Sequence, residues 1–176
     1  LRYAYDPGGR MTRLTDYDGS TLDYTYDAVG NVLTMNDYHS HSTVYSYTDT
    51  GQVSTVTAPG SKTWTYAYNA LGQATKIDLP NGMETHHAFD SSHDLSKIEH
   101  KDGGSVLQGW TYALTNDRGI TTMTAQDGSK WDYEYDGRSR LTKAERYGTD
   151  GTSLLHRYAY TYDDADNLLT KAVYDA

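Results

Sequence analysis

Cysteine is absent from this 176-residue sequence, which also contains only one phenylalanine and three prolines. The lack of cysteine excludes disulfides and thiol chemistry. Positive charge is scarce too, with 15 Lys and Arg against 24 Asp and Glu and a formal net charge of −9. Such a surface repels phosphate backbones, so no nucleic-acid partner is expected. No apolar run approaches the ~20 residues of a membrane helix, so no membrane insertion is expected.

Tyrosine replaces the usual core residues. The chain has 18 tyrosines, only 36% hydrophobic residues and a mean hydropathy of −0.78. Buried aromatic surface must therefore come mainly from tyrosine, whose hydroxyl requires a hydrogen-bond partner. A chain this polar would be disordered if its tyrosines were scattered. They instead recur at regular intervals along the sequence, which favours a folded structure.

The tyrosines mark a repeat. Copies of a Tyr-x-Tyr-Asp-x-x-Gly pattern start at positions 3, 24, 45, 66, 87, 112, 133 and 160, so the first five starts are 21 residues apart. The fifth copy begins with His87, and Leu114 and Thr115 replace the second Tyr and the Asp of the sixth. A fixed period of this size predicts a repeat architecture in which each unit needs its neighbours to form a core.

The recurring positions within the repeat are predicted to be structural. An Asp after the second tyrosine can accept amide hydrogen bonds and close a turn, and the Gly three residues later suggests a positive φ. His93 and Arg118 stand where other copies have this Gly. The predicted structural residues are Tyr3, Tyr5, Asp6, Gly9, Tyr24, Tyr26, Asp27, Gly30, Tyr45, Tyr47, Gly51, Tyr66, Tyr68, Gly72, Tyr133, Tyr135, Asp136, Tyr160, Tyr162 and Asp163.

A second turn follows in each repeat. Asp-Gly or Asn-Gly occurs 15 residues after the repeat start, and these pairs favour type I′ hairpin turns; they are Asp18-Gly19, Asn81-Gly82, Asp102-Gly103 and Asp127-Gly128. His39-Ser40 and Gly60-Ser61 occupy the same phase. The segments between turns alternate with period two, which predicts strands.

The strand that follows the first turn of each repeat, here called the outgoing strand, has two recurring apolar positions three residues apart. Val32 belongs to one of these apolar columns and Met35 to the other. On an ideal strand this spacing places them on opposite faces. Either a bulge intervenes, or both faces of the sheet are partly covered.

These motifs resemble the YD repeat of the Rhs family, which includes bacterial polymorphic toxins, shell subunits of insecticidal toxin complexes and animal teneurins. The resemblance covers essentially the whole of residues 1–176 as a single array of about eight repeats, expected to be a fragment of a longer protein. It implies an all-β fold in which antiparallel hairpins form a coiled, spiral sheet. It also implies a secreted or cell-surface location.

Four tyrosines fall outside the repeat core. Tyr17, Tyr38, Tyr147 and Tyr174 share one column 14 residues after the repeat start, beside the hairpin tips. They are candidate glycan contacts, because exposed rings can stack on sugars, although an exposed Tyr more often covers a strand edge.

The sequence favours no catalytic or metal site, and no cofactor is expected. Asp16 to Asp27 fails the calcium-loop pattern, because Thr21 and Asp27 occupy the positions of the required Gly and Glu. His39 and His41 share a strand face, but no third ligand supports them as a metal site. No G-x-S-x-G elbow or P-loop lysine occurs. Asp6-Pro7-Gly8-Gly9 is similar in letters to the self-cleavage site of Rhs toxins but lies within a regular repeat.

Two functions remain open. The first is a non-enzymatic segment of a YD-repeat shell that encapsulates a toxin polypeptide, with neighbouring repeats of the parent chain and the cargo as partners. The alternative is a carbohydrate-binding or cell-adhesion module. A choline- or glucan-binding repeat is a weaker third reading, since its aromatic-pair signature lacks the Asp-x-x-Gly pattern found here.

Overall fold

A computed structural model describes residues 1–175, which contain sixteen β-strands and no helix. The strands of the first four repeats are β1 (Arg2–Tyr5), β2 (Met11–Thr15), β3 (Thr21–Tyr26), β4 (Val32–Asp37), β5 (Ser42–Tyr47), β6 (Val53–Ala58), β7 (Lys62–Tyr68) and β8 (Ala74–Asp78). Those of the last four are β9 (Met83–Phe89), β10 (Leu95–Asp102), β11 (Ser105–Leu114), β12 (Ile120–Ala125), β13 (Lys130–Tyr135), β14 (Leu141–Tyr147), β15 (Leu154–Tyr162) and β16 (Leu168–Asp175). The prediction of an all-β array with two strands per repeat is confirmed.

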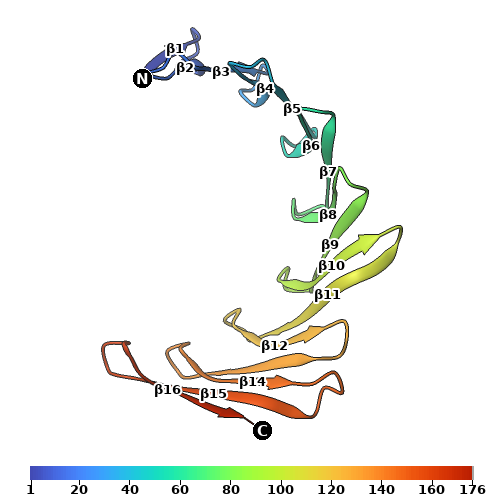
Figure 1. The fold of residues 1–176 in the computed structure, drawn as a ribbon, viewed down its shortest axis with the longest axis vertical. Helices are drawn as coiled ribbons and strands as arrows, with labels where there is room; N and C mark the ends of the chain where they lie inside the picture. Colours follow the sequence, from blue (N-terminus) through green and yellow to red (C-terminus); the bar gives the residue numbers. More distant parts are fainter. Residues whose placement is uncertain (176) are drawn as a thin grey trace. The chain divides into compact units, whose positions relative to one another are not determined.

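Strand order follows chain order from β1 to β16 in one open antiparallel sheet (Figure 1). The chain divides into two compact units, Leu1–Glu84 and Thr85–Ala176. Within each unit every hairpin pairs with the next, so contacts are local in sequence. The coiling of the sheet stays a prediction. The insertions after repeats five and seven lengthen strands, because β11 has 10 residues and β15 has 9.

A β-bulge in the repeat explains how two apolar positions three residues apart lie on the same face of the sheet. Tyr24 pairs with Met35 and Tyr26 with Val32, and the register shifts between Thr25 and Tyr26. One extra residue, Leu33, therefore sits in the outgoing strand, and the columns three apart return to the same face as the tyrosines. Six further repeats have the same register shift between their second and third residues.

The second turns have a different geometry from the prediction in most repeats. A type I′ turn needs positive φ at both central residues. In the Asp16–Ser20 loop only Gly19 has positive φ, 86°, and its amide bonds to the Asp16 carbonyl at 3.1 Å. The three-residue loop with a left-handed Gly accommodates strand twist equally well. The type I′ prediction is therefore wrong at Asp18-Gly19, Asn81-Gly82 and Asp127-Gly128.

At the fifth repeat the turn is displaced by one residue from the predicted Asp102-Gly103 pair. Asp102 pairs directly with Ser105, and Gly103 and Gly104 between them have φ of 54° and 84°. These are the two positive values that a type I′ turn requires.

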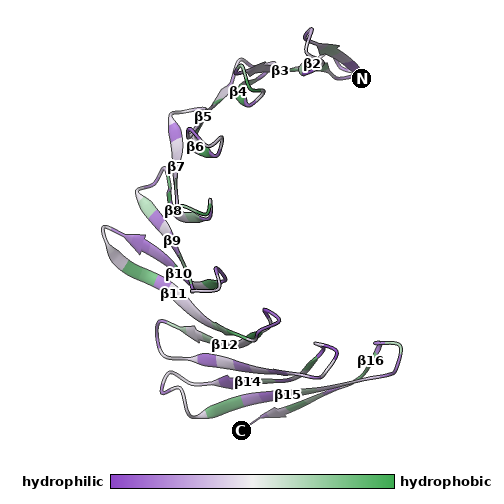
Figure 2. Cartoon of the chain, turned by 180° about the vertical axis from the view of Figure 1, so that it is seen from behind, coloured by the Kyte–Doolittle hydropathy of each residue, from purple (hydrophilic) through white to green (hydrophobic). Residues whose placement is uncertain are grey.

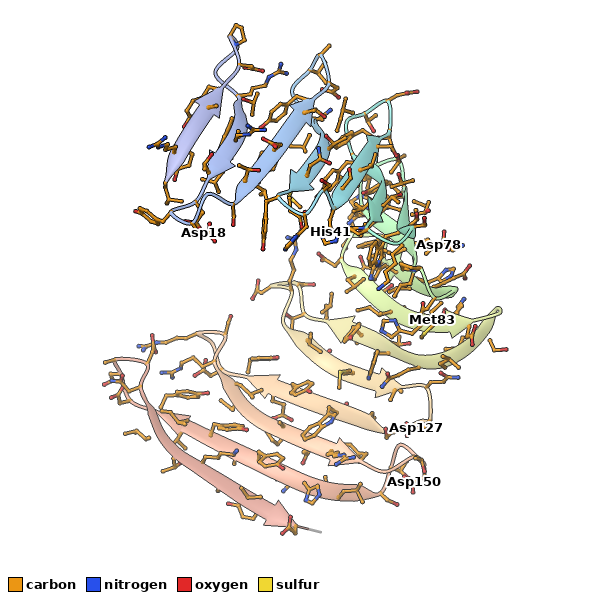
Figure 3. All side chains as sticks on the ribbon, turned by 45° about the horizontal axis from the view of Figure 1, so that its top comes forward. Asp18, His41, Asp78, Met83, Asp127 and Asp150 are labelled. Carbon is orange, nitrogen blue, oxygen red and sulfur yellow. The ribbon has the colours of Figure 1, made fainter. Side chains whose placement is uncertain are left out.

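The sheet is a single layer with two chemically different faces. One face carries the tyrosine and aliphatic columns, while Thr, Ser and charged residues line the other, as in the pairs Thr25–Thr34 and Arg13–Asp23. In both units side chains project from the two faces, and hydrophilic and hydrophobic residues alternate along the strands (Figures 2 and 3). No second layer is formed by the described residues, and Ala144, 4% exposed, is the only buried hydrophobic residue among them. Burial comes from neighbouring side chains of the same face.

Candidate functional site: the joint between repeats

The repeat aspartate organises the turn that follows it. Asp27 Oδ1 accepts the amides of Val29 at 3.0 Å and Asn31 at 2.8 Å. The predicted bond from the amide two residues on is thus confirmed, and a second bond from four residues on was missed. Asp6, Asp90, Asp136 and Asp163 accept the same pair of amides. Asn69 does so through its amide oxygen.

The second carboxylate oxygen holds the side chain of the eighth repeat residue. Asp27 Oδ2 accepts Asn31 Nδ2 at 2.9 Å, and Asp136 Oδ2 accepts Arg140 Nε at 2.7 Å. The hydrogen bonds and charge of Arg140 lower the pKa of the Asp136 carboxyl. The hydrogen bonds of Asn167 lower the pKa of the Asp163 carboxyl without a charge. Arg or Asn at the eighth repeat position therefore has a defined partner, as for Arg10, Asn31, Arg140 and Asn167.

The seventh residue of each repeat adopts the left-handed conformation. Gly9, Gly30, Gly51 and Gly72 have φ between 79° and 99°, as predicted. The same position is occupied by His93, Arg118, Ser139 and Asp166 with φ of 67°, 65°, 59° and 67°. Four copies thus retain the turn without glycine, at a cost in backbone strain.

The second tyrosine of a repeat binds the preceding repeat. Tyr47 Oη donates to the Val32 carbonyl at 2.7 Å, and Tyr68 Oη to the Val53 carbonyl at 2.7 Å. Tyr26, Tyr135 and Tyr162 donate in the same way to Met11, Ile120 and Leu141. The acceptor is always the first strand residue after the preceding turn. Each hydroxyl thus satisfies its own hydrogen bond while joining two repeats.

Arginine adds a second joint at two places. Arg10 donates from Nη1 to the Asp27 carbonyl at 2.9 Å, and its guanidinium lies 5.0 Å from the Tyr26 ring centroid. Arg140 donates to the Asp163 carbonyl at 2.9 Å and lies 4.8 Å from the Tyr162 ring. A guanidinium at this distance over an aromatic face is a favourable cation–π arrangement.

The regular spacing of the tyrosines favours ladders of stacked rings between neighbouring hairpins, but the structure does not form them. Among residues 1–175 no tyrosine ring stacks on that of the adjacent repeat. The reason is the intervening outgoing strand, which places Val32 or Met35 between successive tyrosines. The stacked rings are instead Trp131 on Tyr133 at 6.2 Å and Trp131 on Tyr158 at 6.0 Å.

The polar face contains one buried carboxylate that sequence reasoning missed. Glu145 is 6% exposed and accepts Arg157 Nε at 2.6 Å and the Tyr147 hydroxyl at 3.0 Å. Burial raises the pKa of its carboxyl, but these hydrogen bonds and the nearby Lys143 outweigh burial, so the pKa is lowered. Its register partners in β13 and β15 are Asp132 and Arg157, and only this pairing reveals the network.

The four candidate glycan contacts have different environments. Tyr17 is 88% exposed in the loop between β2 and β3, and Tyr38 is 59% exposed, with its ring centroid 3.8 Å from that of His39 in a tilted arrangement. Tyr174 lies exposed on the edge strand β16. Tyr147 is half-buried, with Lys130 Nζ 4.5 Å from its ring, so a sugar could reach it only by displacing that lysine. The glycan role of all four stays a prediction.

Histidines do not assemble a metal site in the part of the chain that the structure describes. His39 and His41 have ring centroids 5.7 Å apart, and His41 Nδ1 is 2.9 Å from Asp37 Oδ2. Residues 1–175 also form no helix long and apolar enough to cross a membrane.

The fold defines the class of protein, a single-layer array of β-hairpin repeats. The family model for the teneurin YD-shell matches residues 1–118, so the chain belongs to the YD-shell family and is a structural shell module. No curated protein sequence matches it.

Solved structures support the same fold. The chain is similar to crystal structures of TcdB2-TccC3 with Cdc42 (TM-score 0.80, 16% identity) and of TcdB2-TccC3 without its hypervariable C-terminal region (TM-score 0.81, 16% identity). In both, the match covers 98% of this chain and 11% of the other, so the chain spans about a ninth of their length.

Proposed function

We propose that this chain is a segment of a larger YD-repeat shell that encloses a polypeptide. The observation that supports this most directly is the joint between repeats: five of the eight repeats supply a tyrosine hydroxyl to the backbone of the one before. Such a joint can be continued from repeat to repeat, because the acceptor of the tyrosine hydroxyl is a backbone carbonyl, which every repeat has. The fold is therefore suited to building an extended wall.

The hydrogen bonds of the ionisable side chains agree with a structural, non-catalytic role. The ionisable residues of the repeat have assigned structural partners in the turns, such as Asp6 with Arg10 and Asp163 with Asn167. We infer a non-enzymatic role. The resemblance to Rhs toxins and insecticidal toxin complexes suggests a toxin polypeptide as the cargo and a secreted or cell-surface location.

The experiment uses the parent protein that contains this chain. Native parent protein is treated with proteinase K, and digestion of the segment predicted to be cargo is followed by mass spectrometry. Enclosure predicts that the cargo survives in native protein and is digested after mild urea opens the sheet. Equal digestion rates in both states would overturn enclosure.

The carbohydrate-binding alternative keeps a specific observation in its favour, the exposed rings of Tyr17 and Tyr38 at hairpin tips. A glycan array with residues 1–176 tests it. Binding that is lost in Tyr17→Ala and Tyr38→Ala, and kept in the control Tyr3→Ala on the edge strand, would favour this function.

A further inference from the structure

Two repeats use an arginine at their eighth position in the same way. Arg10 covers the ring of Tyr26 and donates to the Asp27 carbonyl. Arg140 covers Tyr162 and donates to the Asp163 carbonyl. In each case the tyrosine and the aspartate belong to the next repeat. A ring face, a carbonyl oxygen and an inserted guanidinium thus form a recurring set.

The sixth repeat has the ring and the carbonyl but lacks the side chain. Its eighth residue is Gly119, and a Cβ at this position would lie 3.5 Å from Tyr135 Cε2. The Asp136 carbonyl accepts the turn bond from the Ser139 amide at 3.0 Å. The equivalent Asp27 carbonyl accepts both its turn amide, at 3.2 Å, and Arg10. At Asp136 the second acceptor position is therefore open.

A cavity of about 540 Å³ marks this place, and its lining includes Thr115, Asp117, Gly119, Glu134, Tyr135 and Asp136. We call it the Gly119 cavity. Its volume is in the range of ordinary ligand pockets. Three of its lining residues are acidic and none is basic. Asp136 pairs with Arg140 and Glu134 with Lys143. Asp117 makes no ion pair within residues 1–175, and the adjacent Arg118 pairs with Asp94 at 2.9 Å.

We propose that the Gly119 cavity binds the arginine side chain of a partner polypeptide. The guanidinium lies over the Tyr135 ring and donates to the Asp136 carbonyl, as Arg10 and Arg140 do within the chain, and Asp117 supplies the counter-charge. Arginine fits better than lysine, because a planar guanidinium stacks on a ring and donates in the plane at the same time. The inference stands on the comparison between repeats and does not depend on the shell proposal.

The test is an NMR titration of ¹⁵N-labelled residues 1–176 with the peptide acetyl-Gly-Gly-Arg-Gly-Gly-amide. We expect saturable shifts of the Gly119, Tyr135 and Asp136 amides. The same peptide with citrulline keeps the shape but removes the charge, and it should bind about tenfold more weakly or worse, because cation–π and charge-assisted bonds are lost. Equal binding of both peptides, or shifts spread over the acidic surface, would overturn the proposal.

Agmatine separates a free guanidine from an arginine in a polypeptide. We expect the arginine peptide to bind at least as tightly as agmatine. Saturation by agmatine with no response to the peptide would show that a polypeptide cannot enter, and would overturn the assignment of the occupant.

A variant fills the cavity from within. The φ of Gly119 is not in the left-handed range, so Gly119→Arg is compatible with the backbone. The nearest neighbour of the added Cβ is Thr115 Oγ1 at 3.2 Å, which accepts the Gly119 amide. We expect Gly119→Arg to raise Tm and to abolish peptide binding. Ala70→Arg adds the same charge at the exposed fifth position of repeat four and should keep binding unchanged. Retained binding in folded Gly119→Arg would place the peptide elsewhere. The titration of the unmodified chain decides the matter if that variant does not fold.

Discussion

The hydroxyl of Tyr47 lies 2.7 Å from the carbonyl oxygen of Val32, the first residue of β4 in the preceding repeat. This bond spans 15 residues of sequence and recurs at the same separation from Tyr26, Tyr68 and Tyr135. It explains the tyrosine at the third position of these repeats, whereas repeats five and six have Phe89 and Leu114 there and lack the bond. Burial also raises the pKa of the Tyr47 hydroxyl, consistent with a neutral donor at physiological pH.

Removing this hydroxyl should weaken the joint. We expect Tyr47→Phe to lower the free energy of unfolding by ~1–2 kcal/mol, because a half-buried carbonyl loses its partner. Tyr45→Phe is the matched control on the same strand, since the Tyr45 hydroxyl makes no hydrogen bond within the described residues. Urea unfolding of both variants measures the difference. Identical midpoints would contradict the joint.

Glycine in the first turn should matter through its backbone conformation alone. Gly51 has φ of 81°, and a methyl group at this position would have no neighbour within 4 Å, so Gly51→Ala should destabilise by ~1 kcal/mol through strain. Gly137 is equally open but lacks positive φ, so Gly137→Ala should stabilise by ~0.4–1 kcal/mol through the unfolded state. Thermal unfolding compares them. The same sign of change for both would contradict the turn assignment.

Acid should loosen the first turns. The pKa of Asp163 is lowered by the Asn167 side chain and backbone amide. Because the folded pKa lies below the unfolded one of about 4, the ionised carboxylate stabilises the fold above that pH, and this contribution is lost as pH falls through the folded value. Asp150 shows how low such a value can be, since Ser153 and Thr152 lower its pKa to about 2.

Asp163→Asn tests this pH dependence, because asparagine keeps the acceptor for both amides, as Asn69 does. The variant should be less stable than the unmodified chain at pH 6, and the difference should shrink as the pH falls from about 4 to about 2. Asp117→Asn is the control, with no turn bond to lose. A stability difference that stays constant through this acid range would show that the charge of Asp163 contributes nothing.

The buried carboxylate of the polar face should be sensitive to truncation. Glu145→Ala leaves Arg157 and the Tyr147 hydroxyl without their partner, and we expect a loss of ~1–2 kcal/mol, reduced from a fully buried pair because Arg157 is half exposed. Glu134→Ala is the control for an exposed ion pair, because the Glu134 carboxylate is exposed and pairs with Lys143. Chemical denaturation should separate the two variants, and equal stability would refute the network.

Much of the fold could be predicted because the tyrosine period and the turn residues repeat. Two signals per 21 residues predicted two strands per repeat, and the aspartate and glycine positions predicted the first turn. The bulge at Leu33 could be posed as an alternative but not decided, because the spacing of Val32 and Met35 alone is compatible with two arrangements. Only the register of the paired strands resolves it.

Features that depend on pairing between strands could not be predicted from the sequence. Glu145 and Arg157 are 12 residues apart and meet only because β14 pairs with β15. The left-handed conformations of Ser139 and Asp166 carry no glycine signal, although their phase within the repeat could have indicated them. The type I′ prediction failed because Asp-Gly also suits the wider three-residue loop.

A shell built from such repeats requires edge strands that accept further strands. The outer strands β1 and β16 carry exposed Tyr3, Tyr5, Leu168 and Val173. Unpaired edges with these side chains readily pair with other chains. In analytical ultracentrifugation of residues 1–176 over a wide concentration range, the account predicts reversible association that rises with concentration and weakens in Val173→Lys. A strict monomer at every concentration would contradict it.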